Sequence, residues 1–518
     1  MSDAPPLVRY RGLAGLAAIA FGLGAGEFVA ALMDRPSPIT AVAGAVIDNV
    51  PRGIERWAIS TFGRNDKKVL GIGIVVALAL AGIVVGARSG GRRRPVVIGA
   101  LMIGVLGVVA TLADRVGGLG DAVPVIAATV IGLAVLLGLL WMLDHPSAST
   151  GSAGAVVGTH TVGRRKFLAY TGLSAVGAAV FGAGGRSIAG NKGAVASRAA
   201  VAAELPSPVR PLPPTAAGVD FAIPGLSPWK VSNADFYRID TAFVVPKIDA
   251  RTWKLEIGGL VDRPRTYTYE DLLKRDLVEA DVTLMCVSNE LGGDLVGNAR
   301  WLGVPLKELL EEAGVQAEAE QVFSTSADGW TSGFPKEIAM DGRNALVAVG
   351  MNGEPLPFAH GFPVRLVIPG IYGYVSATKW LTKIDMLRFA DAEGYWIPRG
   401  WSQLAPVKTS SRIDVPRKDA RIDAGPTVLA GVAWAQHRGI TKVEVQVGAS
   451  EKWQEATLAT DGGIDTWRQW KLNWNATRGD YAIAVRATDR QGKTQSSDYV
   501  PPAPDGAEGW HTIQVHVN

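Results

Sequence analysis

Leu284-Met285-Cys286-Val287-Ser288-Asn289 contains the only cysteine of the 518-residue chain, at the end of a predicted strand. A single cysteine cannot form an internal disulfide, a Cys-x-x-Cys zinc site or a four-thiolate iron–sulfur site. Three roles remain for Cys286: a small apolar side chain in the core, a free nucleophile, or one thiolate ligand of a metal that another molecule mostly holds. The sequence on either side of this stretch has to decide between them.

Long apolar stretches before this region have the length of membrane-spanning helices. Four of them cover residues 13–33, 69–87, 95–113 and 122–143, each near the roughly 20 residues that cross the hydrocarbon. A further stretch at 167–189 is rich in Gly and Ala. Runs this long and this poor in charge are rare in soluble proteins. We therefore expect residues 1–190 to form an all-α transmembrane bundle of about five helices.

Basic residues predict the orientation, because cytoplasmic loops are enriched in Lys and Arg. Arg9 and Arg11 precede the first stretch and residues 88–94 contain four arginines, whereas Asp114 and Asp121 make the next loop acidic. This pattern places the N-terminus in the cytoplasm and everything after residue 190 on the extracytoplasmic side of the cell membrane. All six histidines lie outside the apolar stretches, so no bis-histidine haem is expected within them.

Gly163-Arg164-Arg165-Lys166-Phe167-Leu168 is similar to a twin-arginine export signal, here inside the chain rather than at its start. Such a signal suits a domain that must fold around a cofactor in the cytoplasm before it crosses the membrane. Positive charge in front of a spanning helix is the alternative explanation.

The rest of the chain has the composition of soluble protein. Residues 191–230 are rich in Ala and Pro and predict a semi-rigid linker. Residues 231–405 mix strand and helix patterns, with amphipathic helices beginning near Tyr269 and Pro305, and predict an α+β domain.

From residue 406 to 518 only strand patterns remain. Residues 442–447 and 481–485 alternate apolar and polar side chains, and the spacing of the turns predicts an all-β, seven-stranded immunoglobulin-like sandwich. The net charge of +4 is small and no basic stripe with interleaved aromatic residues is present, so no nucleic-acid partner is expected.

Ordered blocks after residue 231 resemble the sulfite-oxidase family of molybdopterin-dependent oxidoreductases. The blocks are Asp235-Phe236-Tyr237-Arg238, residues 284–289, residues 299–306, residues 351–357, residues 360–365 with Ile368-Pro369-Gly370, and Lys379-Trp380-Leu381. Each block alone is weak evidence for the family, whereas the presence of all the blocks in this order is specific for it. The sandwich is similar to the dimerisation domain of that family, which implies a homodimer.

The resemblance implies a single molybdopterin that carries molybdenum, with Cys286 as the protein ligand of the metal. A thiolate at this position completes the coordination of a metal that the two pterin sulfurs already hold. The glycines of the turn at 369–374 are expected to let the backbone approach the cofactor closely. Cofactor contacts are expected from Asn233, Tyr237, Arg238, Asn289, Arg300, Asp328, His360, Arg365, Ala377, Thr378 and Lys379.

Some of these residues have more specific expected roles. Arg365 and Lys379 would bind the cofactor phosphate, with His360 donating a hydrogen bond. Asp328 would accept from the amino edge of the pterin, and for Arg300 a salt bridge with a carboxylate is the alternative. Tyr395 occupies the position of the family's active-site tyrosine, which implies that it orients an oxyanion or relays a proton.

Two departures from the family bear on the substrate. Animal and plant sulfite oxidases have arginine shortly after the ligand cysteine, where this chain has Glu290 and Leu291, and the family's Arg-Asn-His is replaced around residues 239–241. Fewer cations weaken the case for a small dianion such as sulfite, because a buried unpaired dianion is strongly disfavoured. Candidates to fill the gap from elsewhere are Arg343, Arg399 and Arg412.

The resulting hypothesis is a membrane-anchored, extracytoplasmic enzyme that transfers an oxygen atom at molybdenum in a two-electron reaction. Its substrate would be a small oxo-anion or an S- or N-oxide. A true sulfite oxidase or dehydrogenase is one alternative, and a metal-free membrane-anchored binding or scaffold protein is another. The resemblance includes no haem domain, so a separate electron-transfer protein or a quinone is the expected redox partner.

Overall fold

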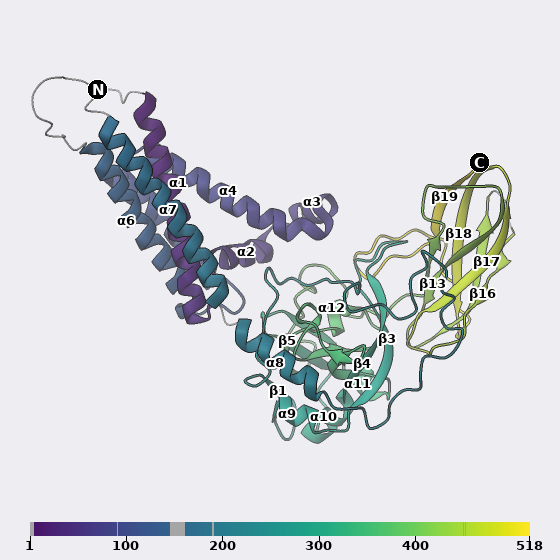
Figure 1. Ribbon diagram of the computed structural model, residues 1–518. Helices are drawn as coiled ribbons and strands as arrows, with labels where there is room; N and C mark the ends of the chain where they lie inside the picture. The colour runs from purple at the N-terminus through teal and green to yellow at the C-terminus, as the bar shows by residue number, and fades with distance from the viewer. Residues whose placement is uncertain (1–4, 91, 146–160, 189–190, 449, 451) are drawn as a thin grey trace, which may run out of the picture. The chain divides into compact units, whose positions relative to one another are not determined.

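The computed structural model describes residues 5–90, 92–145, 161–188, 191–448, 450 and 452–518. They form two compact units (Figure 1), and each is described by itself. The first unit comprises Met1–Gly193 and Thr241–Val245, and the second comprises Ala194–Asp240 and Pro246–Asn518.

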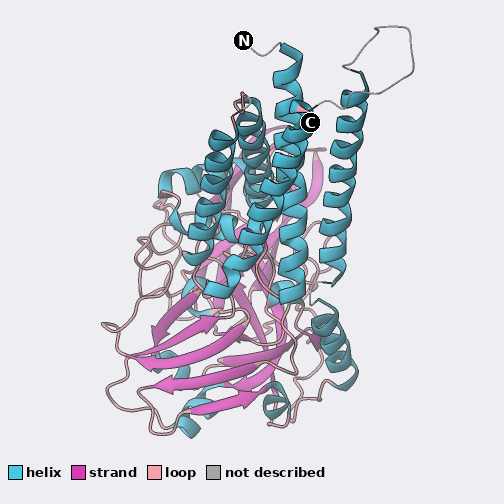
Figure 2. Ribbon diagram, turned by 90° about the vertical axis from the view of Figure 1, so that its left-hand side faces the viewer, coloured by secondary structure: helices cyan, strands magenta, loops and turns pink. Residues whose placement is uncertain are grey.

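The first unit is helical. Its elements are α1 (Pro5–Met33), α2 (Pro38–Asn49), α3 (Arg52–Phe62), η1 (Gly63–Asn65), α4 (Asp66–Ala87), α5 (Arg93–Leu112), η2 (Leu119–Ala122), α6 (Val123–Asp144) and α7 (Thr161–Ile188). Helices α1, α6 and α7 run side by side (Figures 1 and 2), and α1 also packs on α4. Glycine makes these contacts close: a Cβ at Gly15 would lie 1.9 Å from the carbonyl oxygen of Gly82. Small residues at helix contacts are typical of membrane bundles.

Four helical segments of the described chain are long and apolar enough to cross a membrane. They are Leu7–Met33, Asp66–Ala87, Arg93–Leu112 and Leu119–Asp144. The predicted fifth span is helical in α7, but its apolar part is the shorter segment Lys166–Gly182. The twin-arginine-like motif falls near the start of α7, where the side chains of Arg164 and Arg165 lie outside the described residues.

A short segment from later in the chain belongs to the helical unit. Lys67 donates to the carbonyl oxygen of Ala242 at 2.6 Å, and Arg115 donates to Thr241 Oγ1 at 3.0 Å. Arg115 is itself held by both carboxylate oxygens of Asp48. Residues 241–245, which the sequence places in the oxidoreductase domain, are therefore grouped with the helices.

A helix that was not predicted from the sequence provides the first residues of the second unit, which begins at Ala194. Residues 191–204 form α8 (Asn191–Glu204), because their alanine-rich composition favours helix. Arg198 donates to the carbonyl oxygens of Pro355 and Leu356, both at 2.9 Å. The linker prediction is wrong for these residues, which pack on the α+β part.

Two sheets form the α+β part. The first has the order β3 (Val278–Met285), β4 (Val296–Pro305), β7 (Leu346–Met351), β8 (Glu354–Pro355), with β9 (Arg365–Val367) also on β7. The second has the order β2 (Arg265–Thr268), β1 (Lys254–Gly259), β10 (Leu381–Leu387), β5 (Gln321–Ser326), β6 (Thr331–Pro335). Short helices connect the strands: α9 (Tyr269–Leu273), α10 (Leu306–Ala313), α11 (Lys336–Met340), η3 (Phe358–His360) and α12 (Gly373–Ser376).

The C-terminal part is all β (Figures 1 and 2). One sheet has the order β11 (Ser410–Val415), β13 (Gly425–Trp434), β17 (Arg468–Ala476), β16 (Thr457–Leu458). The other has the order β12 (Ala420–Ile422), β19 (His511–Val517), β18 (Gly479–Asp489), β14 (Ile440–Val447), β15 (Gln454–Glu455). The region is thus divided into more strands than the seven predicted, three of them only two or three residues long. Trp434 and Trp467 belong to the core of the α+β part, which is why both parts form one unit.

Candidate cofactor site

Cys286 lies directly after β3, in a loop that closes on itself. Its backbone N–H donates to Leu295 O at 3.0 Å, and its carbonyl accepts from Asn289 N at 3.1 Å. Asn289 Oδ1 in turn accepts from Leu295 N at 2.7 Å. The Asn289 side chain, expected at the cofactor, therefore holds the loop. Burial raises the pKa of the Cys286 thiol, while hydrogen bonds from Ser288 and the charge of Lys379 oppose that shift.

The C-terminal strands brace the same loop. Arg412 Nη1 donates to Gly293 O at 2.6 Å, and Trp434 Nε1 donates to Met285 Sδ at 3.0 Å. The His511 ring lies so close that its Nε2 would be 2.2 Å from a Cβ at Gly292. Arg412 was expected as a cation for the substrate, and the bracing of this loop was not predicted, because nothing in a single sequence pairs residue 292 with residue 511.

Arg365 is a buried cation with only 4% of its surface exposed. Its guanidinium donates to the carbonyl oxygens of Leu366, His360 and Ala377, and its Cζ lies 5.0 Å from the centre of the Trp301 ring. Burial lowers the pKa of Arg365 to about 10. Among its described contacts none is a carboxylate. A buried guanidinium with spare N–H groups is suited to an anionic ligand.

Lys379 is the second buried cation. Its Nζ lies 2.8 Å from Asp240 Oδ2 and donates to Ala359 O at 3.1 Å. Burial lowers the pKa of Lys379 to about 8; Asp240 opposes this shift, while Arg365 and Arg238 add to it. Arg238 shares the same carboxylate, with its Nε 2.8 Å from Asp240 Oδ2. One acid therefore faces several cations, and the cluster carries net positive charge. Asp240 is a site residue that the sequence analysis missed.

His360 and Tyr237 complete the cluster. His360 Nε2 lies 3.0 Å from Asn233 O and must donate to it. Burial, together with Arg365 and Lys379, lowers the pKa of His360 to about 4, so the ring is neutral. The expected donor role is wrong for this tautomer, because only Nδ1, an acceptor, remains for a ligand. Burial and the negative charge of a Cys286 thiolate raise the pKa of Tyr237, which therefore keeps its proton.

Arg300 is not part of this cluster. It binds Asp281 through two hydrogen bonds of 2.9 and 2.8 Å, and its Nη1 lies 3.9 Å from Glu279. The next residue, Trp301, faces Arg365, and successive side chains of a strand point to opposite faces. Arg300 therefore forms a salt bridge with a carboxylate in this structure, which was the alternative to a cofactor contact.

Other expected contacts have structural partners. Asp328 Oδ1 accepts from Trp330 N at 3.1 Å and stabilises a turn. Thr378 Oγ1 lies 2.7 Å from the Ser324 hydroxyl, inside the protein. At Gly370, with φ of +87°, a Cβ would lie 2.9 Å from Arg343 Nη1. Glycine is favoured there because L side chains rarely adopt this positive φ.

Tyr395 lies beside β6. Its N–H donates to Thr331 O at 3.0 Å, and Arg399 covers its ring with Cζ 3.6 Å from the centre. Its role next to the metal stays a prediction. The other two arginines considered for the substrate are bound to acids: Arg343 lies 2.6 Å from Asp341 and Arg412 lies 2.6 Å from Asp414.

Comparison with known proteins identifies relatives of this part of the chain. Residues 242–396 match the family described as oxidoreductase molybdopterin binding domain. Mitochondrial sulfite oxidase of Mus musculus is 27% identical over 325 residues, which cover 53% of this chain and 59% of the relative. The matched part of the chain is similar to the sulfite-oxidase family of molybdenum oxidoreductases.

Two further similar proteins carry different names. The NADH nitrate reductase of Solanum lycopersicum is 28% identical over 314 residues, covering 48% of this chain and 34% of the relative. The crystal structure of the sulfane dehydrogenase SoxCD from Paracoccus pantotrophus matches with a TM-score of 0.50 and 24% identity, over 57% of this chain and 82% of that chain. That likeness shows the fold. The curated relatives are longer, and the first is matched over only 59% of its length.

The residues present fit the cofactor that a sulfite-oxidase family member implies. Within the described part of the chain, no group of three or more His, Cys, Asp or Glu side chains could hold a metal alone. A metal beside Cys286 would therefore need a chelator from outside the protein, and a pterin dithiolene is such a chelator. Arg365 and Lys379 supply buried positive charge for its phosphate.

Proposed function

We propose that this chain is a membrane-anchored, extracytoplasmic oxidoreductase that holds molybdenum–molybdopterin and transfers an oxygen atom to or from a small sulfur or nitrogen oxo compound. When bound, the cofactor supplies two-electron redox chemistry and the site of oxygen transfer. The observation that supports this most is the pair of buried cations Arg365 and Lys379 near Tyr237 and Cys286. Asp240, the carboxylate that Lys379 contacts, is shared with the more exposed Arg238. Burying these cations without an anion is costly, so their burial argues for an anionic ligand.

The chain's own residues have separate tasks in this proposal. Cys286 binds the metal as a thiolate, and metal binding offsets the raised pKa of the thiol by displacing its proton. Arg365 and Lys379 bind the phosphate of the pterin. His360 accepts a hydrogen bond at Nδ1, because Nε2–H is already donated to Asn233. Tyr237 keeps its hydroxyl proton near Cys286 and can donate a hydrogen bond to an oxygen of the substrate, and Tyr395 is proposed for the same purpose.

The substrate is proposed to be an uncharged S- or N-oxide or a weakly charged oxo-anion. Glu290 and Leu291 stand where sulfite oxidases have arginine, and Arg343 and Arg412 are committed to carboxylates. A dianion would thus lack the positive groups that its burial requires. The relatives named sulfite oxidase and nitrate reductase indicate that the fold serves oxo compounds of both elements.

The helical unit is proposed to anchor the enzyme in the cell membrane with the second unit outside the cytoplasm. Its apolar helices and the arginines of residues 88–94 support this orientation. Electrons would be exchanged with a separate protein or a quinone, and the C-terminal strands would form a homodimer.

Metal analysis and one substitution test the proposal. Full-length protein from cells that make molybdopterin should contain about one molybdenum and one pterin per chain by elemental analysis and pterin fluorescence. Cys286→Ser should stay folded and lose at least about 100-fold of the turnover. Sulfite, methionine sulfoxide and trimethylamine N-oxide should be compared with artificial electron carriers in both directions.

A matched pair of arginine variants serves as control. Arg365→Gln should lose the pterin, whereas Arg300→Gln, on the opposite face of β4, should retain it. Parental turnover in Cys286→Ser, or full pterin content in Arg365→Gln, would contradict the proposal.

A further inference from the structure

Asp240 is an acidic side chain inside a cluster of cations. Its Oδ2 lies 2.8 Å from Lys379 Nζ and accepts from Arg238 Nε at 2.8 Å, and its Oδ1 accepts from Arg238 Nη2 at 3.2 Å. The Asp240 side chain is only 5% exposed. A buried carboxylate repels an anionic ligand, so its presence beside a site for an anion requires a compensating role.

Two contacts fix the ammonium group of Lys379. Its Nζ donates to Asp240 Oδ2 at 2.8 Å and to Ala359 O at 3.1 Å. An ammonium carries three N–H donors, so in the described part of the chain one of them remains for a ligand. The four-carbon stem of a lysine is flexible, and holding its end in one place costs rotamer entropy. Asp240 therefore orders the remaining donor before an anion binds.

The charged and titratable groups that face Lys379 come from four parts of the chain. They are Asp240 and Arg238 from the segment before residue 241, Arg365 from β9, His360 from η3, and Cys286 after β3. Burial lowers the pKa of Lys379 to about 8, and the charges of Arg365 and Arg238 add to this shift. Asp240 opposes the shift through its charge and its hydrogen bond. The carboxylate therefore helps to keep the ammonium charged near neutral pH.

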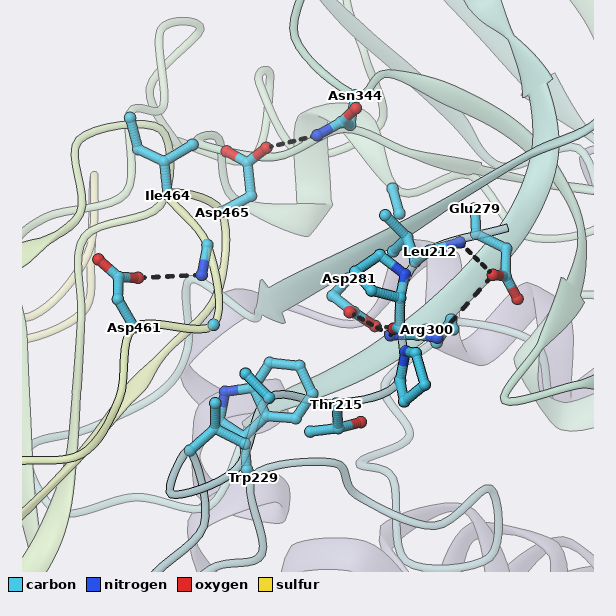
Figure 3. A pocket seen from close by; sticks show the side chains of 17 residues that line it. Leu212, Thr215, Trp229, Glu279, Asp281, Arg300, Asn344, Asp461, Ile464 and Asp465 are labelled. Carbon is cyan, nitrogen blue, oxygen red and sulfur yellow. Dashed lines mark hydrogen bonds and ion pairs between the residues drawn. The ribbon is translucent and has the colours of Figure 1, made fainter. Parts of the chain in front are cut away.

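Arg300 shows the opposite balance of charge. Figure 3 shows this arginine with Asp281 and Glu279, two acids of the neighbouring strand β3. Asp281 alone accepts two hydrogen bonds from it, at 2.9 and 2.8 Å. Two acids thus meet one cation there, whereas Lys379 and Arg238 share a single acid. Asp240 fixes its lysine without cancelling the positive charge of the cluster.

We propose that Asp240 is a positioning residue, which holds the Lys379 ammonium in the place and the charge state that the phosphate of the cofactor requires. This inference rests on the proposed function, because the phosphate belongs to the proposed cofactor. Its consequence has a sign that simple repulsion does not give. Removal of a carboxylate that only repelled the anion would strengthen anion binding. Removal of Asp240 should weaken anion binding, because the residue acts through Lys379.

Calorimetric titration of the full-length, cofactor-free protein with sulfate between pH 5.5 and 9 tests this role. In Asp240→Ala the affinity at the low-pH plateau should fall at least about fivefold, because the ammonium is no longer held in place. In Asp240→Asn the amide oxygen can still accept from Lys379, so the plateau should change by no more than about twofold. The fall in affinity should begin at a lower pH in Asp240→Asn than in the parent, because the pKa of Lys379 loses the negative charge that raises it.

Further variants make the result specific. Asp281→Asn and Asp281→Ala are matched controls, since this acid pairs with Arg300 away from the cluster, and both should bind sulfate as the parent does. In a Lys379→Gln background, Asp240→Ala should cause no further loss of affinity, because Asp240 acts through the lysine. Asp240→Asn preserves the shape of the side chain, so it tests the inference even where Asp240→Ala does not fold.

The pterin content separates this inference from the proposed function. In full-length protein from cells that make molybdopterin, Asp240→Ala should retain at least about threefold less pterin than the parent, measured by pterin fluorescence. A parent without pterin would contradict the proposed function itself. In a parent with pterin, three results would each overturn the positioning role alone: an Asp240→Ala plateau at or above that of the parent, an Asp240→Asn profile that falls at the parental pH, or parental pterin content in Asp240→Ala.

Discussion

At the scale of single residues, burial decides the chemistry of the cofactor site. Arg365 and Lys379 are ordinary basic residues in the sequence, but in the structure their pKa values are lowered to about 10 and about 8. The physical cause is the loss of water around a charge that only Asp240 partly compensates. The same loss of water keeps His360 neutral and the Tyr237 hydroxyl protonated.

The Lys379 pKa predicts a pH-dependent affinity for dianions. In the cofactor-free protein Lys379 is charged below about pH 8 and loses its proton above it. Sulfate does not titrate in this range and favours the charged lysine. Its association constant should therefore be level below pH 8 and fall by up to about tenfold per pH unit above it. Calorimetric titration with sulfate between pH 6.5 and 9.5 would measure this.

Two lysine variants make that result specific. Lys379→Gln should bind sulfate weakly at every pH, without a step. Lys383→Gln, whose lysine is 45% exposed and paired with Asp385, should behave like the parent. A parental affinity that stays level from pH 7 to 9.5 would show that Lys379 does not face the anion.

At the scale of elements, the loop that follows β3 depends on strands far away in the sequence. Arg412 of β11 and His511 of β19 both reach it, and Trp434 of β13 bonds to Met285. The position of Cys286 is thus set by the C-terminal strands as well as by its own sheet. Gly292, with φ of +76°, is required because the His511 ring occupies the place of a side chain.

Gly292→Ala should therefore impair the enzyme through the loop. A non-glycine residue at positive φ costs about 1–2 kcal/mol, and the clash with His511 adds to it. We expect a lower melting temperature and at least about tenfold lower turnover, measured by thermal unfolding and the oxo-compound assay. In a Gly292→Ala, His511→Ala double variant part of the melting temperature should return, because the clash is removed and only strain remains.

Gly353→Ala is the control for backbone strain alone. Gly353 has φ of +83° with nothing within 4 Å of an added Cβ. The Gly353→Ala substitution should lower the melting temperature slightly and leave turnover unchanged. An equal loss of turnover in both alanine variants would refute a specific role for the contact with His511.

At the scale of the whole molecule, the chain combines a helical unit whose apolar helices suit a lipid environment with a unit rich in strands. Much of the apolar surface of α4 and α5 is exposed, for example at Ile72, Leu101 and Leu106. In water such a surface would be an aggregation liability, whereas in a bilayer it faces lipid.

The proposed orientation predicts which loops can be labelled from outside the cell. The only natural cysteine is buried, so a Cys286→Ser parent gives no background. Val116→Cys, at a position 52% exposed between the spans Arg93–Leu112 and Leu119–Asp144, should react with a membrane-impermeant maleimide in intact cells. Arg92→Cys, between α4 and α5, should react only after lysis. The opposite pattern would place the second unit in the cytoplasm.

Much of this protein follows from patterns that are local in the sequence. Apolar length identifies the helices α4, α5 and α6, since crossing hydrocarbon requires a continuous run. Alternation locates β14 and β18 because side chains of a strand point to two faces in turn. The ordered blocks around Cys286, Arg365 and Lys379 indicate the family, because each block is short and contiguous.

Only the tertiary structure decides which side chains meet. Asp240 pairs with Lys379, which is 139 residues away in the sequence. Arg300 points away from the cluster of buried cations, although the ring of its neighbour Trp301 contacts Arg365. The helix at 191–204 is held in place by hydrogen bonds to residues 355 and 356, which composition alone does not reveal. Charge, protonation and cavity shape depend on desolvation and on long-range contacts, and these exist only once the chain is folded.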